Sequence, residues 1–351
     1  MDPVLKSEDL TVDLRDGTKR PLVITKAIGQ GSFGTVWKGF IDENIVVAVK
    51  QTRRTSKQAV AEFEKEIAIM QHLQSEYVVR VYGSVTLESS LLIVMEYIGL
   101  GSLAELVERN YLSPRMRMMY ALHVCRGMKY LHAMKVIHRD LKPGNVLCVS
   151  NNIDDPVLCK ITDFGASRVT DQDSTATFTM TKGIGSPFYM SPEMLRNDKQ
   201  YTRAIDVYSF AIMCVELWNL QLPFSEHDFE SAVGLFLNSL NNRQNTLTLL
   251  FFLFTQHLEC KLLQDSDQCS TAIVQTRCLL RSKFAGLKIL MNDCVCCFLL
   301  LLMFLVRHMC LFLNTAFEEI EEELDKVIEE LKRQEEPGTV HMRPKNVDEM
   351  Y

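Results

Sequence analysis

The chain has 351 residues, of which 47% are hydrophobic and 23% are charged, and its formal net charge is −6. This length allows one two-lobed domain or two average domains joined by a linker. The near-average composition excludes bulk disorder, a disulfide scaffold and a fibrous repeat. The negative charge and the lack of a basic stripe in the sequence argue against nucleic acid as a partner.

The eleven cysteines are an odd number and do not form the close pairs that are typical of metal sites. We expect most of them to be buried free thiols. The first 20 residues carry charges throughout and offer no apolar run to a secretory signal. We therefore expect a cytoplasmic protein.

Two short segments near the start, residues 22–28 and 45–49, are rich in Val and Ile, which predicts strands. Between them, Gly29, Gly31 and Gly34 form a glycine-rich turn whose backbone N–H groups can approach phosphate oxygens. Dinucleotide-binding folds share this spacing, but a helix should then follow. The sequence after Gly34 predicts a strand instead, which disfavours a dinucleotide-binding fold.

Lys50 ends the second predicted strand. A lysine that the strand holds in place can bind the α- and β-phosphates of a nucleotide. Residues 59–73 are predicted to form an amphipathic helix, with apolar side chains at spacings of three and four. This helix carries Glu66, which can pair with Lys50. Glu62 and Glu64 are nearby competitors that are most simply interpreted as solvated.

Residues 136–147 contain a carboxylate, an ammonium and an amide within six positions. Asp140 can accept or orient the proton of a substrate hydroxyl, Lys142 can neutralise a γ-phosphate, and Asn145 can offer its carbonyl oxygen to Mg²⁺. Asp163 follows a predicted strand at 157–161 and supplies the hard oxygen ligand that Mg²⁺ requires. A second amphipathic helix is predicted at 120–134.

Taken in order, these motifs resemble the signature set of eukaryotic protein kinases, with Ser191-Pro192-Glu193 where Ala-Pro-Glu is usual. The resemblance implies an α+β, two-lobed protein-kinase-like fold, with a small antiparallel β lobe that carries one helix and a larger, mainly helical lobe. ATP and Mg²⁺ should bind in the cleft between the lobes. The five polar catalytic positions then fall on Lys50, Glu66, Asp140, Asn145 and Asp163.

The same resemblance assigns apolar and supporting positions. Met95 should guard the rear of the adenine pocket, and Glu96 and Ile98 should offer backbone groups to adenine. The resemblance also implies an adenine sandwich of Val36, Ala48 and Leu147, and an apolar spine that contains Met70, His138 and Phe164. It implies that Asp206 hydrogen-bonds the backbone of the catalytic loop.

Lys142 and the string at 185–189 resemble serine/threonine kinases, and Trp37, residues 63–67 and residues 206–210 resemble their tyrosine-kinase-like group. The expected activity is transfer of the γ-phosphate of ATP to serine or threonine of protein substrates in signal transduction. The alternative is a pseudokinase-like module that binds nucleotide but transfers poorly because its C-lobe is defective.

Regulation is expected through Arg139, because such an arginine usually meets a phosphate on the activation segment between Asp163 and Glu193. The middle of that segment holds five hydroxyl side chains, Ser174, Thr175, Thr177, Thr179 and Thr181. A phosphate there would add about −1.5 to −2 charge beside Arg139. An upstream kinase or autophosphorylation would supply it.

The expected domain organisation places an N-terminal extension at 1–21, the N-lobe and hinge at 22–98, and the C-lobe at 99–233. Residues 234–314 are atypical, apolar and Cys-rich, and lack the family's expected Arg-Pro, whose arginine would pair with Glu193. We interpret them as an insertion or, preferably, as mistranslated sequence. The acidic last helix resumes at 315–336, followed by a polar tail at 337–351; Arg277, Arg281 and Arg307 are weak substitutes for the missing arginine.

Residues 295–313 are almost wholly apolar but contain Arg307 and His308. A membrane span needs about 20 mostly apolar residues, and a central arginine costs about 2.5 to 3.5 kcal/mol. We therefore prefer a buried helix here and keep a membrane contact as the alternative.

Overall fold

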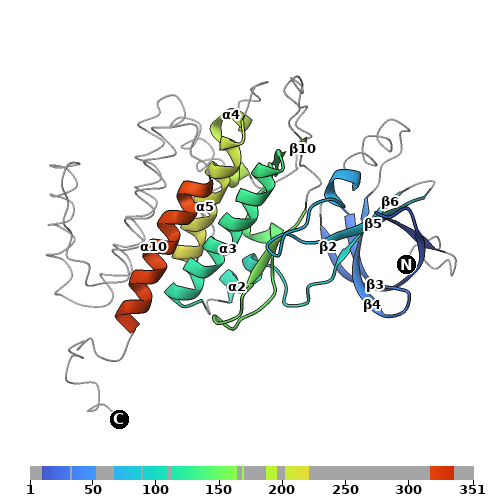
Figure 1. Cartoon of the computed structure of the whole chain (residues 1–351), viewed down its shortest axis with the longest axis horizontal. Coiled ribbons are helices and arrows are strands. Elements are labelled where there is room, and N and C mark those ends of the chain that lie inside the picture. The colour runs from blue at the N-terminus through green and yellow to red at the C-terminus, as the bar shows by residue number, and fades with distance from the viewer. Residues whose placement is uncertain are drawn as a thin grey trace, which may run out of the picture.

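The computed structural model describes residues 10–31, 34–52, 67–87, 90–109, 112–163, 168–169, 187–195, 202–220 and 317–335. Its first part is a closed antiparallel barrel, in the strand order β1-β2-β3-β4-β6-β5. The strands are β1 (Thr11–Leu14), β2 (Lys19–Gly31), β3 (Gly34–Ile41), β4 (Ile45–Thr52), β5 (Val81–Thr86) and β6 (Leu91–Glu96). Both predicted strands of this region, and the strand expected after Gly34, are confirmed (Figure 1).

The barrel begins earlier than the sequence analysis placed it, because β1 lies inside the stretch assigned to an N-terminal extension. Leu10 and Val12 are 7% and 0% exposed. Their alternation with polar residues is the period of a half-buried strand. At Gly83 of β5, a Cβ would lie 2.1 Å from the Asp13 carbonyl oxygen, so glycine lets β1 approach and close the barrel.

Alternation along β4 divides its side chains between two cores. Val47 and Val49 point into the barrel interior. Ala48 belongs to a second, larger core that continues into the helical part of the molecule. Because Lys50 is two residues from Ala48, it lies on the same face of the strand. The strand pattern thus delivers a lysine to the side of the sheet that faces the helices.

The helix predicted at 59–73 is described only from Ile67 onward, where residues 67–70 are helical. Ile67, Met70 and Leu73 are buried in the larger core, as the predicted spacing requires. Glu66, Glu62, Glu64 and Phe63 lie outside the described residues.

The second part of the molecule is mainly helical. Its helices are α2 (Leu103–Glu108), α3 (Pro114–Ala133), α4 (Pro192–Leu195), α5 (Ala204–Asn219) and α10 (Phe317–Glu335), with short 3₁₀ turns η2 (Pro143–Asn145) and η4 (Pro187–Tyr189). Short strand pairs are formed by β7 (Val136–Ile137) with β10 (Arg168–Val169), and by β8 (Val146–Cys148) with β9 (Cys159–Ile161). The predicted second helix is confirmed, but it begins at Pro114, where Ser113 caps the N-terminus.

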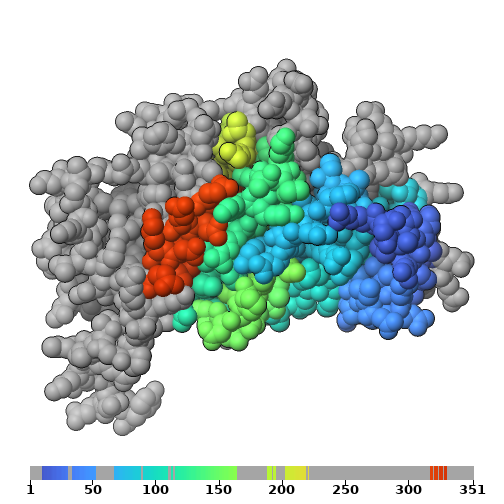
Figure 2. Space-filling view, viewed as in Figure 1, coloured from blue at the N-terminus to red at the C-terminus, as the bar shows by residue number. Residues whose placement is uncertain are grey.

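The predicted last helix is confirmed as α10, which packs on α3 (Figures 1 and 2). Phe317, Ile320, Leu324 and Ile328 form its buried stripe, at helical spacings of three and four. Charged residues flank this stripe. Glu321 lies 2.9 Å from the Arg126 guanidinium and 3.1 Å from the Lys129 ammonium.

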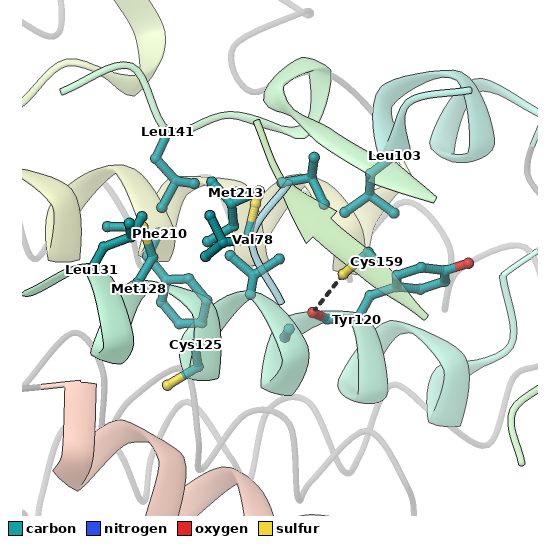
Figure 3. Close-up of a cluster of buried hydrophobic side chains, with 14 of the residues drawn as sticks. Val78, Leu103, Tyr120, Cys125, Met128, Leu131, Leu141, Cys159, Phe210 and Met213 are labelled. Atoms are coloured by element: carbon teal, nitrogen blue, oxygen red, sulfur yellow. Dashed lines mark hydrogen bonds between the residues drawn. The ribbon is translucent and has the colours of Figure 1, made fainter. Parts of the chain in front are cut away.

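The larger core is built around α3, whose residues Tyr120, Cys125, Met128 and Leu131 meet Phe210 and Met213 of α5 (Figure 3). The Cys159 thiol contacts the Tyr120 carbonyl oxygen at 3.8 Å. Cys125, Cys148, Cys159 and Cys214 are buried free thiols, as predicted. Burial raises the pKa of Cys148 to about 12, so this side chain stays protonated at neutral pH.

Across the described ranges, no helix is both long enough and apolar enough to cross a membrane. The apolar run at 295–313 lies outside those ranges, as does the rest of 234–314.

Candidate active site

Lys50 of β4 meets Asp163 at the end of β9. The Lys50 ammonium lies 2.5 Å from the Asp163 carboxylate, and Lys50 is 9% exposed. The register that pairs Lys50 with Val36 on one side and Ile93 on the other fixes this position. The structure therefore brings together the expected phosphate-binding cation and the expected metal-binding carboxylate. The expected partner Glu66 lies outside the described residues.

The loop between β7 and β8 gathers the three polar side chains that the sequence singled out. The Lys142 ammonium contacts both Asp140 carboxylate oxygens, at 2.8 and 3.0 Å. The Asn145 Nδ2 donates to the Asp140 carboxylate at 2.9 Å and to its carbonyl oxygen at 2.7 Å. The carboxylate of Asp140 is thus held between a cation and an amide donor.

Asp206 of α5 holds the backbone of this loop, as the resemblance implied. Its two carboxylate oxygens accept hydrogen bonds from the backbone N–H groups of His138 (2.9 Å) and Arg139 (2.8 Å). Arg139 has a φ of 68°, in the left-handed region that non-glycine residues rarely adopt. Asp206 is fully buried and so stabilises the strained turn that precedes Asp140.

One supporting residue of this turn was not predicted. The His132 Nε2 lies 2.8 Å from the Asp206 carboxylate. A ring nitrogen that faces a carboxylate donates its proton, so His132 completes three donors around one buried acid. Nothing in the spacing between α3 and α5 indicates this contact, because 74 positions separate the two residues.

Hydrogen bonds tie the loop of Asn145 to the segment that leads to Asp163. The N–H of Thr162 donates to the Asn145 carbonyl oxygen at 2.9 Å, and the His138 ring bonds the Thr162 carbonyl at the same distance. Asp163 follows with a φ of 65°, another left-handed residue. Because the Asn145 Nδ2 is engaged with Asp140, its Oδ1 is the atom left to face a cation. A carboxylate and an amide oxygen suit Mg²⁺ bound to phosphates.

The apolar residues expected around adenine belong to the larger core or border it. Ala48 lies in the larger core, and Val36, Leu147, Ile98 and Tyr97 pack against it. Ala48 pairs with Met95 across β4 and β6. Met95 lines a small cavity together with Lys50, Met70 and Asp163, consistent with its expected place at the rear of the pocket.

The side chain of Glu96 is engaged away from this apolar surface. Its carboxylate contacts the Lys160 ammonium at 2.7 and 2.9 Å and accepts a hydrogen bond from the Arg80 N–H. The Glu96 N–H donates to the Arg80 carbonyl oxygen at 2.8 Å, so of the expected adenine contacts of Glu96 only its carbonyl oxygen can serve. Phe164, the remaining spine residue, lies outside the described residues.

The three glycines of the turn differ in what they do. Gly34 has a φ of 136°, and a Cβ there would lie 1.9 Å from the Gln51 carbonyl oxygen. The hairpin itself therefore requires glycine at this position. A Cβ on Gly29 would meet no atom within 4 Å, so that position borders open space, on the turn where the resemblance implies phosphate binding. Gly31 ends β2, opposite Gly34.

This difference predicts separate outcomes for two alanine substitutions. Gly34→Ala is expected to destabilise the fold by about 1–3 kcal/mol, because it combines a clash with a strained φ. Gly29→Ala should leave the unfolding midpoint unchanged and raise the KM for ATP, since its Cβ points into the space for phosphate. Urea unfolding and ATP titrations of both variants separate the two roles; equal loss of stability would contradict this assignment.

A buried acid near the end of α5 is hydrogen-bonded to η4. The Tyr189 hydroxyl donates to Glu216 of α5, which is 4% exposed, and the Ser209 hydroxyl donates to the Tyr189 carbonyl at 2.7 Å. Burial raises the pKa of the Glu216 carboxyl from 4.5 to about 7; the Tyr189 hydrogen bond opposes this shift, and Glu108 adds to it. No short-range pattern in the sequence indicates this pair, because 27 positions separate the two residues.

The raised pKa predicts a pH dependence of stability. The folded chain keeps the Glu216 proton up to about pH 7, whereas the unfolded chain releases it near 4.5. The protonated Glu216 side chain therefore contributes roughly 3 kcal/mol to the free energy of unfolding. This contribution is fully present below pH 4.5 and is lost as the pH rises through 7. Glu216→Gln should lose less stability between pH 5 and 8 than the unmodified chain, measured by urea unfolding. The exposed control Glu322→Gln should behave like the unmodified chain, and a parallel loss in both variants would contradict the prediction.

The expected anchor of Glu193 cannot be followed in the same way. Glu193 is half-buried in α4. Its candidate partners Arg277, Arg281 and Arg307 lie outside the described residues, as do the five hydroxyl residues of the activation segment.

Comparison with known proteins agrees with this geometry. A probable serine/threonine-protein kinase of Dictyostelium discoideum is 35% identical over 212 residues, which cover 59% of this chain and 22% of that protein. Serine/threonine-protein kinase VIK of Arabidopsis thaliana is 35% identical over 213 residues, which cover 58% of this chain and 48% of VIK. Serine/threonine-protein kinase CTR1 of the same plant is 37% identical over 214 residues, which cover 58% of this chain and 24% of CTR1. The matches span less than half of each of these relatives.

The family model described as protein kinase domain matches residues 22–276, which is well over half of the chain. This match includes the first part of the segment at 234–314 that the sequence motifs left outside the kinase pattern. The chain belongs to the protein kinase domain family.

Proposed function

We propose that this chain transfers the γ-phosphate of ATP to serine or threonine hydroxyls of protein substrates. The observation that carries the proposal is the arrangement around Asp140, whose carboxylate lies within 3.0 Å of Lys142 and Asn145. Asn145 is in turn tied to the residue that precedes Asp163. The proposed base Asp140, the cation Lys142 and the metal ligand Asn145 thus belong to one hydrogen-bonded unit, which is connected to the segment of Asp163.

Each side chain has a separate task in this proposal. Asp140 orients the substrate hydroxyl and accepts its proton, and Lys142 offsets negative charge on the transferred group. Asn145 Oδ1 and Asp163 would hold Mg²⁺, which neutralises the phosphates of bound ATP. Lys50 would hold the α- and β-phosphates, in place of its present contact with Asp163. Lys142 supports a serine/threonine preference, and the motifs around Trp37 and Asp206 support membership of the tyrosine-kinase-like group.

One observation favours the alternative of a module that binds nucleotide without transfer. The Lys50 ammonium forms an ion pair with the Asp163 carboxylate, which is the group expected to bind Mg²⁺. If this ion pair persists with ATP bound, binding occurs without productive metal placement. The two functions differ in a single assay.

The test uses the purified full chain with γ-labelled ATP, Mg²⁺ and a generic basic protein. Labelled protein should appear, and it should disappear on chelation of Mg²⁺ and in Asp163→Asn. Asp154→Asn, an exposed carboxylate on the turn between β8 and β9, is the matched control and should retain transfer. ATP binding without transfer in the unmodified chain would overturn the proposal and support the alternative.

Regulation by phosphate on the activation segment is part of the same proposal. Arg139, whose backbone Asp206 fixes beside Asp140, is the expected partner of such a phosphate, supplied by an upstream kinase or by autophosphorylation. Alanine at Ser174, Thr175, Thr177, Thr179 and Thr181 together should lower transfer. Unchanged activity in that variant would exclude this form of regulation.

A further inference from the structure

The last helix contacts the support of the catalytic loop through its first residue. Phe317 of α10 is 1% exposed. Its ring lies edge-on to the His132 imidazole, at 4.9 Å between centroids and 68° between planes. It also lies edge-on to Phe210 of α5, at 5.5 Å and 81°. One ring of α10 therefore touches α3 and α5 at the point where these two helices meet.

His132 continues this contact to the catalytic loop. Its Nε2 bonds Asp206 at 2.8 Å, and Asp206 accepts the N–H groups of His138 and Arg139. Arg139 directly precedes Asp140. An unbroken series of packed and hydrogen-bonded groups thus runs from the start of α10 to the turn that presents the proposed base.

Several independent contacts fix where Phe317 sits. The Cys125 thiol donates to the Phe317 carbonyl oxygen at 3.3 Å. One turn along α10, Glu321 pairs with Arg126 and Lys129 of α3. These contacts hold the helix by its backbone and by charge, on the side of α3 that faces α10 (Figure 2). The ring therefore has little freedom to withdraw from His132.

We infer that Phe317 is a positioning residue for the catalytic loop, acting through the His132 imidazole. Edge-to-face packing fixes the plane of a ring. In the observed plane the imidazole directs Nε2 at Asp206; rotation would turn a carbon edge toward the carboxylate and leave it with two donors instead of three. Asp206 would then hold the left-handed Arg139 less firmly, and Asp140 would be less well oriented. This inference rests on the proposed transfer function for its kinetic consequence.

The experiment compares two substitutions on the buried stripe of α10. Phe317→Leu removes the ring edge, whereas Ile328→Ala removes apolar volume about three turns along α10 from Phe317. Phe317→Leu is expected to lower kcat about threefold to tenfold. This is the rate change that corresponds to losing the interaction energy of one aromatic pair. The KM for ATP should stay constant. Ile328→Ala should leave kcat unchanged, measured well below the unfolding transition of both variants.

A second readout does not depend on activity. The backbone amides of His138 and Arg139 donate hydrogen bonds to Asp206. Hydrogen exchange of these two amides should accelerate in Phe317→Leu and not in Ile328→Ala. In a His132→Phe background, Phe317→Leu should add no further effect on either readout. Equal effects of the two α10 substitutions, or additive effects with His132→Phe, would overturn the inference. If the unmodified chain shows no transfer, the proposed function fails, while amide exchange still decides the role of Phe317.

Discussion

Replacing Asp140 by asparagine is expected to lower kcat for phosphoryl transfer by about a hundredfold to ten-thousandfold, the usual contribution of a positioned base. The substitution keeps the shape of the side chain but removes its capacity to accept a proton. It also removes the charge that holds the Lys142 ammonium at 2.8 Å. Two effects thus act on the same step, since neither the hydroxyl nor Lys142 would be correctly placed. Initial rates with saturating ATP measure the change.

The fold should tolerate this substitution, because the Asp140 side chain is partly exposed and its Asn145 contacts include a backbone carbonyl that is retained. The unfolding midpoint and the affinity for ATP should therefore match those of the unmodified chain. Asp154→Asn serves again as the control for loss of one surface carboxylate. A variant at Asp140 that keeps more than a tenth of the original kcat would show that another group accepts or orients the proton.

How much of this site could be predicted depended on where its information lies in the chain. The parts within short motifs could be located from the sequence, because local spacing places them: the turn at Gly29–Gly34 between two strands, Lys50 on the second predicted strand, and the loop that carries Asp140 and Asn145. The strand β1 was missed because its alternation covers only four residues, too few to establish a period by themselves, and because one of its two partners, β5, lies about 70 positions away. Closure of the barrel depends on the absence of a Cβ at Gly83, which only the fold explains.

Polar contacts between helices were harder still to predict. Glu216 and Tyr189 are 27 positions apart, and each is a single polar residue in apolar surroundings. Their pairing depends on how η4 packs against α5. The role of His132 likewise depends on the distance between α3 and α5. Asp206 was predicted, because the family resemblance named its position, but its third donor and the aromatic ring behind that donor emerge only from the packing of three helices.

Removing the Asp206 carboxylate is expected to cost more stability than any other single change discussed for this site. Asp206→Ala leaves three buried donors without their acceptor: two backbone N–H groups and the His132 ring. Each unsatisfied donor costs about 1–3 kcal/mol, and loss of one member of a buried charged contact typically costs about 3–5 kcal/mol in all. The strained φ at Arg139 then has no compensation, so the loop should relax and kcat should fall with the stability. Urea unfolding and initial rates at low temperature measure the two losses.

Asparagine at the same position separates charge from hydrogen bonding. Asp206→Asn keeps one oxygen acceptor and replaces the other by an NH₂ group. With the amide oxygen toward His132 and His138, which share one carboxylate oxygen, two of the three contacts survive, and the Arg139 N–H faces the NH₂ group. Its stability should therefore lie between that of Asp206→Ala and the unmodified chain, while its kcat should be reduced nearly as far as in the alanine variant, because the two backbone donors need both oxygens to hold the left-handed turn. If Asp206→Asn retained full kcat, the hydrogen bond from the Arg139 N–H to Asp206 would not be needed to place Asp140, and other contacts would hold the left-handed turn at Arg139.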